Sequence, residues 1–457
     1  MKRSFVITLG SIVLCLISFG SSPTRAQDKA PAKVRAVLGV YEYEGKPNDD
    51  AFAPFNPAKA PPAGALLLKT GDRLAIVGDS ITEQKMYSRI IESYLTVCVP
   101  ELKVTVRQYG WSGEKTDGFL RRMDQDCLRF KPTVATLCYG MNDSRYRPYD
   151  AVNGRWYRDH LSAIVDNFQA DGVRVIVGSP GCTGKIAAWV QSRQGTLQEH
   201  NLNLCTLRDI ALETAQDKKA AFADIFWPMY QAQVTTPKRL GKTPEEYAVA
   251  GKDGVHPGWA GQTVMAYAFL KAMGLSGDLG TYDVDLGAGT AAATGGHVVK
   301  SFTAGELNIE STQYPFCATG ALDDDNSIRS GMTLVPFSKD LNRLTLKVRG
   351  LKTPKVKVTW GSEARVFSAE QAAAGINLAD EFHVNPFSES FARVDTAVYA
   401  KQAYETEQIK AVFHGERGKK DIEAAATETE AKRQPLADAI QAALKPVSHT
   451  IRIEPHA

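Results

Sequence analysis

The amino-acid sequence predicts an α/β protein whose main domain is built on a parallel β-sheet covered by helices on both faces. Between residues 71 and 274, short apolar runs rich in β-branched residues alternate with amphipathic stretches of helical spacing. The apolar runs are nearly continuous, which is typical of strands buried on both faces. From residue 275 the pattern changes to alternating apolar and polar residues, and from residue 386 it becomes helical again.

Five strands and the helices between them make up the predicted main domain. The strands are RLAIV (73–77), KVTVRQY (103–109), TVATLCY (133–139), VRVIVGS (173–179) and AAFADI (220–225). Residues 87–95 and 160–170 are predicted helices, because their apolar residues recur at intervals of three and four. In a parallel sheet of this kind, the loops at the carboxyl ends of the strands form the usual site.

Two further parts are predicted after the main domain. Residues 275–385 are expected to form a β-rich module, since LTLKVRG and KVKVTWG alternate apolar and polar residues. Residues 386–457 are expected to form a helical hairpin that turns near HGERGKK, followed by a terminal strand at SHTIRIEP. The charges of the hairpin are interpreted as a solvated face and not as a binding site.

The N-terminus has the pattern of an export signal. Lys2 and Arg3 precede the apolar run FVITLGSIVLCLISFG, and small residues flank Arg25 before a cleavage point after Ala26. Residues 1–26 are therefore predicted to be a signal peptide, and the protein to be periplasmic or extracellular. The apolar run is short for a bilayer span, so no membrane span is expected after cleavage. Residues 27–70, rich in Pro and Ala, are predicted to form an arm along the main domain.

Composition narrows the class of partner. Hydrophobic residues make up 44% and charged residues 23% of the 457 residues, as in soluble globular proteins. The net charge of +3 is too small to indicate nucleic acid as a partner. The sequence does not indicate an oligomeric state.

Six cysteines remain after the predicted signal peptide. Cys138 lies in an apolar strand and is predicted to be a buried thiol. Cys182 and Cys205 flank a loop and a helix, and they are the candidate pair for a disulfide in an exported protein. No CxxC spacing occurs, so no zinc site is indicated.

The stretch VGDSITEQ, residues 77–84, places a serine directly after a strand. Asp79 or Ser80 can simply cap the next helix, or Ser80 can be a nucleophile. A nucleophilic serine needs a base, usually a histidine oriented by a carboxylate. Asp253 and His256, three residues apart in KDGVHPGWAGQ, can supply both from a single turn.

A second Asp-x-x-His pair occurs in LADEFHVNP, at Asp380 and His383. This pair lies beyond the predicted α/β domain, and we interpret it as a loop hydrogen bond.

Two more strand ends offer donors for a developing oxyanion. In YGWSGEKT, Gly113 lets a backbone N–H approach a reacting carbonyl. In YGMNDSRY, the side chain of Asn142 can donate. The alternatives are an ordinary glycine turn and a helix cap.

Taken in order, VGDSIT, WSGEKT, YGMND and DGVHP resemble the four sequence blocks of the SGNH/GDSL hydrolase superfamily, over residues 72–272. The resemblance implies a flavodoxin-like three-layer fold and a catalytic triad of Ser80 as nucleophile, His256 as base and Asp253 as its orienting carboxylate. It also implies oxyanion donors from Gly113, Asn142 and the amide of Ser80. No metal or organic cofactor is required.

The predicted function is that of an exported serine esterase that hydrolyses short-chain esters, principally acetyl esters, on carbohydrate. The partner is therefore a small-molecule or polysaccharide ester substrate. Trp111, Met141 and Trp259 are candidate substrate contacts, and Tyr146 and Trp156 lie in or near the same loops. The aromatic residues can stack on a sugar ring or belong to the core. Lipase, phospholipase or thioesterase activity, acyl transfer to a second alcohol, and glycan binding without catalysis remain alternatives.

Overall fold

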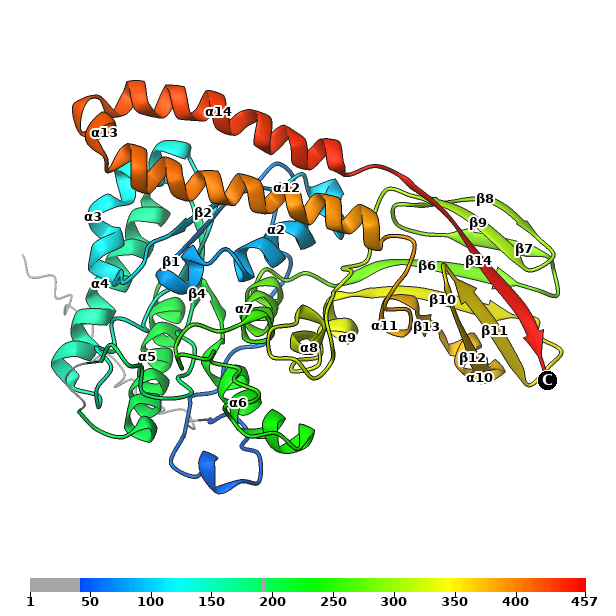
Figure 1. Cartoon of the computed structure of the whole chain (residues 1–457), viewed down its shortest axis with the longest axis horizontal. Coiled ribbons are helices and arrows are strands. Elements are labelled where there is room, and N and C mark those ends of the chain that lie inside the picture. Colours follow the sequence, from blue (N-terminus) through cyan, green and yellow to red (C-terminus); the bar gives the residue numbers. More distant parts are fainter. Residues whose placement is uncertain (1–41, 191–193) are drawn as a thin grey trace, which may run out of the picture. The chain divides into compact units, whose positions relative to one another are not determined.

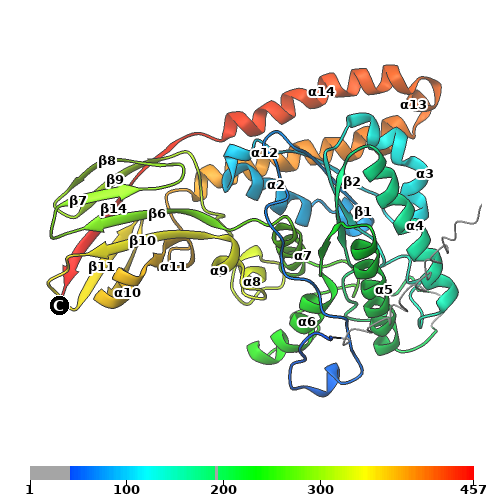
Figure 2. The same ribbon diagram turned by 180° about the vertical axis from the view of Figure 1, so that it is seen from behind.

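The computed structural model describes residues 42–190 and 194–457, which Figures 1 and 2 draw in colour from opposite sides. The predicted signal peptide and residues 27–41 of the predicted arm lie outside the described residues. Residues Glu42–Ala457 form one compact unit. Within the described ranges, no helix is long and apolar enough to cross a membrane.

A parallel five-stranded sheet forms the centre of the main domain, with the strand order β2-β1-β3-β4-β5. Its strands are β1 (Arg73–Gly78), β2 (Thr105–Gly110), β3 (Val134–Cys138), β4 (Arg174–Gly178) and β5 (Ala221–Ala223). This is the flavodoxin-like order, which places a switch point between β1 and β3. The predicted fold class is confirmed.

Helices cover both faces of this sheet (Figure 1). They are α1 (Ser80–Glu83), α2 (Tyr87–Val97), α3 (Thr116–Asp126), α4 (Ala151–Ala170), α5 (Leu197–Asp217), α6 (Phe226–Leu240) and α7 (Trp259–Ala272), with short 3₁₀ turns at Asp50–Phe52, Pro100–Leu102 and Leu128–Phe130. In β1, Leu74 and Ile76 belong to a core shared with α2 and α7, whereas Ala75 and Val77 belong to a core shared with α3 and α4. Alternate residues of one strand thus bury themselves on opposite faces, which explains the unbroken apolar run.

The described part of the arm packs on the main domain through aromatic side chains. Phe52 and Phe55 are fully buried. The rings of Phe55 and Tyr230 lie 4.5 Å apart, and Phe52 meets Trp227 edge-on at 5.7 Å.

Two further sheets make up the β-rich module (Figure 2). One has the order β13-β10-β6-β7 and the other the order β12-β11-β14-β9-β8. The strands are β6 (Asp278–Asp285), β7 (Thr290–Ala293), β8 (His297–Thr303), β9 (Glu306–Ser311), β10 (Arg343–Arg349), β11 (Lys355–Trp360), β12 (Glu363–Ser368), β13 (Ile376–Asn377) and β14 (Val447–His456), and the short helices are α8 (Ile328–Met332), α9 (Phe337–Leu341), α10 (Ala369–Ala374) and α11 (Leu378–Glu381). The C-terminal strand β14 is paired antiparallel to both β11 and β9, so the end of the chain completes the middle of its sheet.

A chain of buried hydrogen bonds links these two sheets. Trp360 Nε1 donates to His449 Nδ1 at 3.1 Å, and His449 Nε2 lies 3.0 Å from Ser311 Oγ. Ser311 Oγ lies 2.7 Å from His297 Nδ1, and His297 Nε2 lies 2.8 Å from the carbonyl oxygen of Leu279. Because an indole only donates and a carbonyl only accepts, the direction of each link is fixed and both imidazoles are neutral with hydrogen on Nε2.

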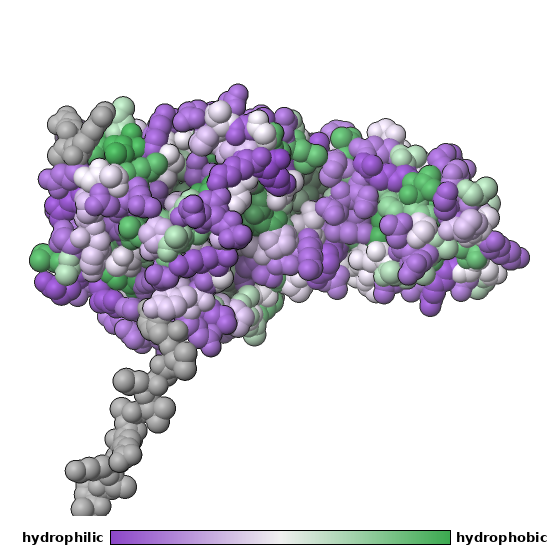
Figure 3. Space-filling view, turned by 90° about the horizontal axis from the view of Figure 1, so that it is seen from below, coloured by the Kyte–Doolittle hydropathy of each residue, from purple (hydrophilic) through white to green (hydrophobic). Residues whose placement is uncertain are grey.

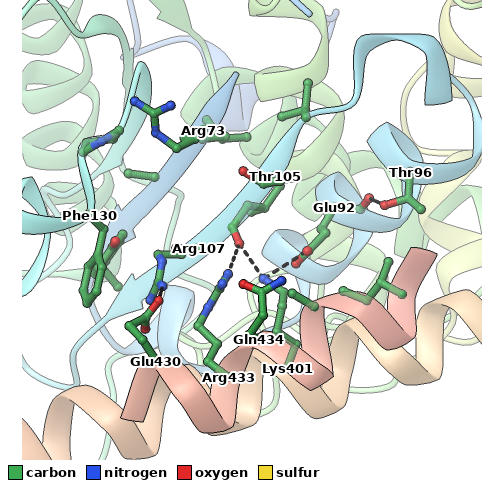
Figure 4. A pocket seen from close by; sticks show the side chains of 18 of the residues that line it. Arg73, Glu92, Thr96, Thr105, Arg107, Phe130, Lys401, Glu430, Arg433 and Gln434 are labelled. Carbon is green, nitrogen blue, oxygen red and sulfur yellow. Dashed lines mark hydrogen bonds and ion pairs between the residues drawn. The ribbon is translucent and has the colours of Figure 1, made fainter. Parts of the chain in front are cut away.

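The C-terminal hairpin consists of α12 (Ser388–Glu407), a π-helical segment (Gln408–Phe413), α13 (Glu416–Lys420) and α14 (Ile422–Ala443). It runs alongside α2 and the edge strand β2 (Figure 1). Lys401 and Arg433, both labelled in Figure 4, donate through Nζ and Nη2 to the carbonyl oxygen of Val106. The N–H of Gln108 donates to Glu405. The hairpin thereby satisfies backbone groups that an edge strand otherwise leaves open.

The charges that face β2 are buried, unlike those on the outer side of the hairpin. Lys401 is 1% exposed, and its ammonium group lies 3.0 Å from Glu92 and 2.9 Å from Glu405. A charge at this depth is tolerated because it is paired on two sides.

One prediction about the cysteines is wrong. The six cysteines of the described ranges are all free and buried, so Cys182 and Cys205 form no disulfide. Both are packed in the hydrophobic core as small apolar side chains, and burial raises the pKa of Cys205 to about 12. The predicted burial of the Cys138 thiol is confirmed.

Figure 3 shows one face of the molecule, on which hydrophilic residues predominate. Hydrophobic residues form separate small groups over the main domain and the β-rich module.

Candidate active site

Ser80 stands at the carboxyl end of β1, as the first residue of α1. The helix cap is Asp79, whose carboxylate accepts the N–H of Ile81 at 3.0 Å. The Ser80 hydroxyl is therefore left for another partner, and its Oγ lies 2.8 Å from His256 Nε2. A glycine is needed at position 78, because a Cβ there would lie 2.1 Å from Thr82 Oγ1 and 2.8 Å from the Cys138 carbonyl oxygen.

His256 and Asp253 share one turn between α6 and α7. His256 Nδ1 lies 2.7 Å from Asp253 Oδ2, while Asp253 Oδ1 accepts the N–H groups of Val255 and His256, both at 2.8 Å. Burial raises the pKa of Asp253, but these backbone donors and the imidazole outweigh it, and the pKa lies below its ordinary value. The ionised carboxylate accepts from Nδ1–H, so Nε2 presents its lone pair to the Ser80 hydroxyl.

Asn142 joins the other two sequence blocks to the serine. Its Nδ2 donates to the carbonyl oxygen of Glu114 at 3.1 Å and to Asp79 Oδ2 at 3.3 Å. Its Oδ1 accepts from the hydroxyl of Tyr146 at 3.0 Å. The amide thus lies between the residue before Ser80 and the residue after Gly113, at the switch point between β1 and β3.

Two backbone donors complete the predicted oxyanion set. The N–H of Ser80 is at the first position of a helix, where it has no acceptor within the helix. Gly113 is exposed and has φ +73°, and a Cβ there would have no atom within 4 Å. Glycine is therefore favoured at this position by the backbone conformation and not by crowding.

An open hollow of about 370 Å³ surrounds the serine and histidine. It is lined by Ser80, Glu83, Gln84, Lys85, Ser112, Asp253 and His256. All seven residues are polar or charged. Ser112 also lines a neighbouring hollow of about 360 Å³, together with Trp111, Gly113 and His414.

The residue before the serine, Asp79, carries a buried carboxylate. Burial, together with the nearby charges of Asp143 and Glu114, raises the pKa of Asp79 to about 7, although the N–H of Ile81 opposes this shift. The carboxylates of Glu114 and Asp143 have their own donors, namely Arg122 and Thr116.

The predicted substrate contacts occupy different surroundings. Trp111 is half-buried and lines the hollow beside Ser112. Trp259 is half-buried at the start of α7, with the guanidinium of Arg89 5.7 Å from its ring centre. Met141 is only 2% exposed and is packed in the hydrophobic core, which leaves it little surface for a substrate. Trp156 packs on His160, with ring centres 4.3 Å apart.

Two features of the site were missed by the sequence analysis. Trp189, which is 48% exposed, lies with its ring centre 5.6 Å from that of His256. Its position in the loop after β4 was the available signal, because that loop opens at the same edge of the sheet as Ser80. The second feature is the pair Glu83 and Lys85. Glu83 ends the helical turn that begins with Ser80, Lys85 follows two residues later, and both line the hollow around Ser80.

The second Asp-x-x-His pair is elsewhere. Asp380 and His383 line a separate cavity of about 240 Å³ with Arg329 and Phe337. Ser80 is not among the residues that line it.

Comparison with known proteins gives a family match over the main domain. Residues 76–264 match the model of the GDSL-like lipase/acylhydrolase family. An acetylxylan esterase of Geobacillus stearothermophilus is 24% identical over 229 residues, which cover 45% of this chain and 95% of that protein.

Solved structures include one that extends over most of the chain. A gut microbial diltiazem-metabolizing enzyme matches with a TM-score of 0.68 and 21% identity, over 86% of this chain and all of that one. A catalytic mutant of the Geobacillus stearothermophilus acetylxylan esterase matches with a TM-score of 0.37 and 20% identity, over 46% of this chain and 96% of that one. Because of the family match and the sheet order, we assign the main domain to the SGNH/GDSL hydrolase superfamily, and the protein is a serine ester hydrolase.

Proposed function

We propose that this protein is an exported esterase that removes short acyl groups, principally acetyl, from carbohydrate by means of a Ser80–His256–Asp253 triad. The observation that carries the proposal is the unbroken line of hydrogen bonds from Ser80 Oγ through the imidazole to Asp253, at 2.8 and 2.7 Å. This line holds the imidazole in the tautomer that accepts the serine proton.

Hydrolysis would take two steps. His256 Nε2 accepts the Ser80 proton as Oγ attacks the ester carbonyl, and the same proton then leaves with the alcohol. Water next attacks the acyl-enzyme and gives a proton to Nε2, which passes it to Ser80 Oγ as the acyl–oxygen bond breaks and the acid leaves. The N–H groups of Ser80 and Gly113 and the amide of Asn142 would stabilise the oxyanion in both steps. The longer of the two Asn142 bonds, 3.3 Å to Asp79, is the one we expect to be exchanged.

The lining of the hollow favours a polar alcohol and a short acyl group. A long acyl chain needs an apolar pocket, whereas every residue lining the hollow is polar or charged. The exposed ring of Trp189 beside His256 offers a surface on which a sugar can stack. The printed activity of the Geobacillus relative, an acetylxylan esterase, points to the same substrate class. Export is supported by the pattern of residues 1–26.

The first experiment replaces the nucleophile. Ser80→Ala should abolish turnover of 4-nitrophenyl acetate and labelling by a fluorophosphonate probe, with thermal unfolding nearly unchanged. Ser301→Ala, at an exposed serine of β8, is the matched control and should behave as the unmodified protein. Undiminished turnover in Ser80→Ala would reject the triad.

The second experiment addresses the substrate. We expect kcat/KM to fall along a series of nitrophenyl esters from acetyl to octanoyl, and acetate to be released from acetylated polysaccharides. A maximum at octanoyl would favour a lipase instead. Product analysis with added sugar separates hydrolysis from acyl transfer.

A further inference from the structure

The turn of the C-terminal hairpin reaches the rim of the candidate active site. Lys410, in the π-helical segment Gln408–Phe413, has its Nζ 2.7 Å from Glu83 Oε1. Glu83 lies in the helical turn that begins with Ser80, and it lines the same hollow. A residue more than 300 positions along the chain is thus ion-paired to the helix that carries the serine.

The second oxygen of this carboxylate fixes the loop after β2. Glu83 Oε2 accepts the backbone N–H of Ser112 at 2.5 Å. Ser112 immediately precedes Gly113, whose N–H is a predicted oxyanion donor. Glu83 therefore links the hairpin on one side to the oxyanion loop on the other.

Trp111, the first residue of that loop, is also held by the hairpin. Lys410 Nζ lies 5.2 Å from the centre of its indole ring, and the imidazole of His414 meets the ring edge-on at 4.8 Å. His414 is itself anchored, with Nε2 2.8 Å from Asp126. Within the loop, Trp111 N–H donates to the carbonyl of Gly78, at the end of β1.

The Glu83 carboxylate depends on Lys410 for its charge partner. Its side chain is 19% exposed, and burial acts to raise its pKa. Lys410 and Ser112 reverse this shift and keep the pKa below its ordinary value. Lys85, which is nearer in the sequence, donates instead to the backbone carbonyl of Glu83, at 2.6 Å.

We propose that Lys410 is a positioning residue for catalysis, which holds Glu83 so that its carboxylate fixes the Ser112–Gly113 backbone in the geometry of an oxyanion hole. This inference rests on the proposed function of Ser80 and Gly113, and it assigns the hairpin a role in the reaction. Without Lys410, the carboxylate loses its partner and turns toward solvent or Lys85. The Ser112 N–H is then released, and the loop that carries the Gly113 donor is no longer held in place.

The test compares kcat with KM in variants of the full chain. Lys410→Met should lower kcat for 4-nitrophenyl acetate about 10-fold, a part of the 10²–10³ lost when an oxyanion donor is removed outright. KM should change less than about twofold, because the oxyanion interaction strengthens only in the transition state. Lys410→Arg keeps the positive charge and should restore most of kcat.

A matched control and a double-mutant cycle separate positioning from stability. Lys432→Met makes the same change at an exposed lysine of α14 that pairs within the hairpin, and it should leave kcat unchanged. Glu83→Gln retains an acceptor for Ser112 but removes the charge pair. In that background, Lys410→Met should lower kcat less than about twofold further, since coupled residues are not additive.

An unchanged kcat in Lys410→Met overturns the inference, and so do fully additive effects in the cycle. A loss that Lys410→Arg fails to rescue and that follows a lowered unfolding temperature also overturns it, since this shows a purely structural role. These failures leave the proposed function intact, because Ser80→Ala and the series of nitrophenyl esters test that function separately.

Discussion

Replacing Asp253 by asparagine should stop catalysis by changing the tautomer of His256. Asp253 Oδ1 accepts two backbone N–H groups at 2.8 Å, so in the variant the amide oxygen is held at that position. The amide NH₂ then faces His256 Nδ1 and donates to it. The imidazole proton moves to Nε2, which can no longer accept the proton of Ser80.

The size of this effect follows from the hydrogen bonds. Turning the amide over would lose two bonds of about 1 kcal/mol each, so the competent orientation falls to roughly one molecule in 30. The carboxylate charge that stabilises the imidazolium is lost as well. Together we expect kcat to fall by about 10⁴-fold, or about 5.4 kcal/mol. The unfolding temperature should change little, because the backbone bonds remain.

The assay measures kcat for 4-nitrophenyl acetate and thermal unfolding in Asp253→Asn and in Asp380→Asn. The second variant makes the same substitution in the other Asp-x-x-His pair, which lies in a separate cavity, and it should retain full activity. An Asp253→Asn enzyme that keeps kcat within tenfold of the unmodified protein would refute this reasoning.

Three other outcomes are expected. Lys401→Met should lower the free energy of unfolding by about 3–5 kcal/mol, because it leaves Glu92 buried without its cation. Urea unfolding measures this loss, and a loss below about 1 kcal/mol would contradict the prediction. Burial lowers the pKa of His449 to about 3, whereas in the unfolded chain it is about 6.5. Protonation therefore favours the unfolded chain as the pH falls below about 6.5, and the free energy of unfolding should be lower by about 2 kcal/mol at pH 5. Urea unfolding at pH 7 and pH 5 should therefore show a smaller pH effect in His449→Gln, and an equal effect would count against the chain of buried hydrogen bonds through His449. Trp189→Ala should raise KM for an acetylated polysaccharide about 3–10-fold while changing kcat for nitrophenyl acetate little, with Trp156→Ala as the comparison.

Local patterns in the sequence were sufficient for much of the fold. Strands β1, β3 and β4 are buried on both faces, so their apolar runs are unbroken and easily recognised. The hairpin was recognisable because helical periodicity is a property of neighbouring residues. The pair Cys182 and Cys205 was misread because burial in a core and pairing in a disulfide leave the same apolar surroundings in the sequence.

The sequence also placed Ser80, Gly113, Asn142 and the Asp253–His256 turn at strand ends or in one loop. That these segments meet depended on the parallel sheet, whose carboxyl ends share one edge. Trp189 escaped notice because its relation to His256 is a contact between distant loops with no motif of its own.

By itself, the sequence determined the parallel sheet, the order of the chemical groups along the chain and the helical nature of the C-terminal segment, because each is encoded by residues close to one another. Only the tertiary structure decided that strand β14 completes the β-rich module and that Lys410 reaches Glu83 beside the serine. Those contacts join residues from 91 positions apart, as in the pairing of Trp360 with Ile451, to more than 300, and no local periodicity records them. They follow from which surfaces remain to be covered once the sheet has formed, which is a property of the packed molecule.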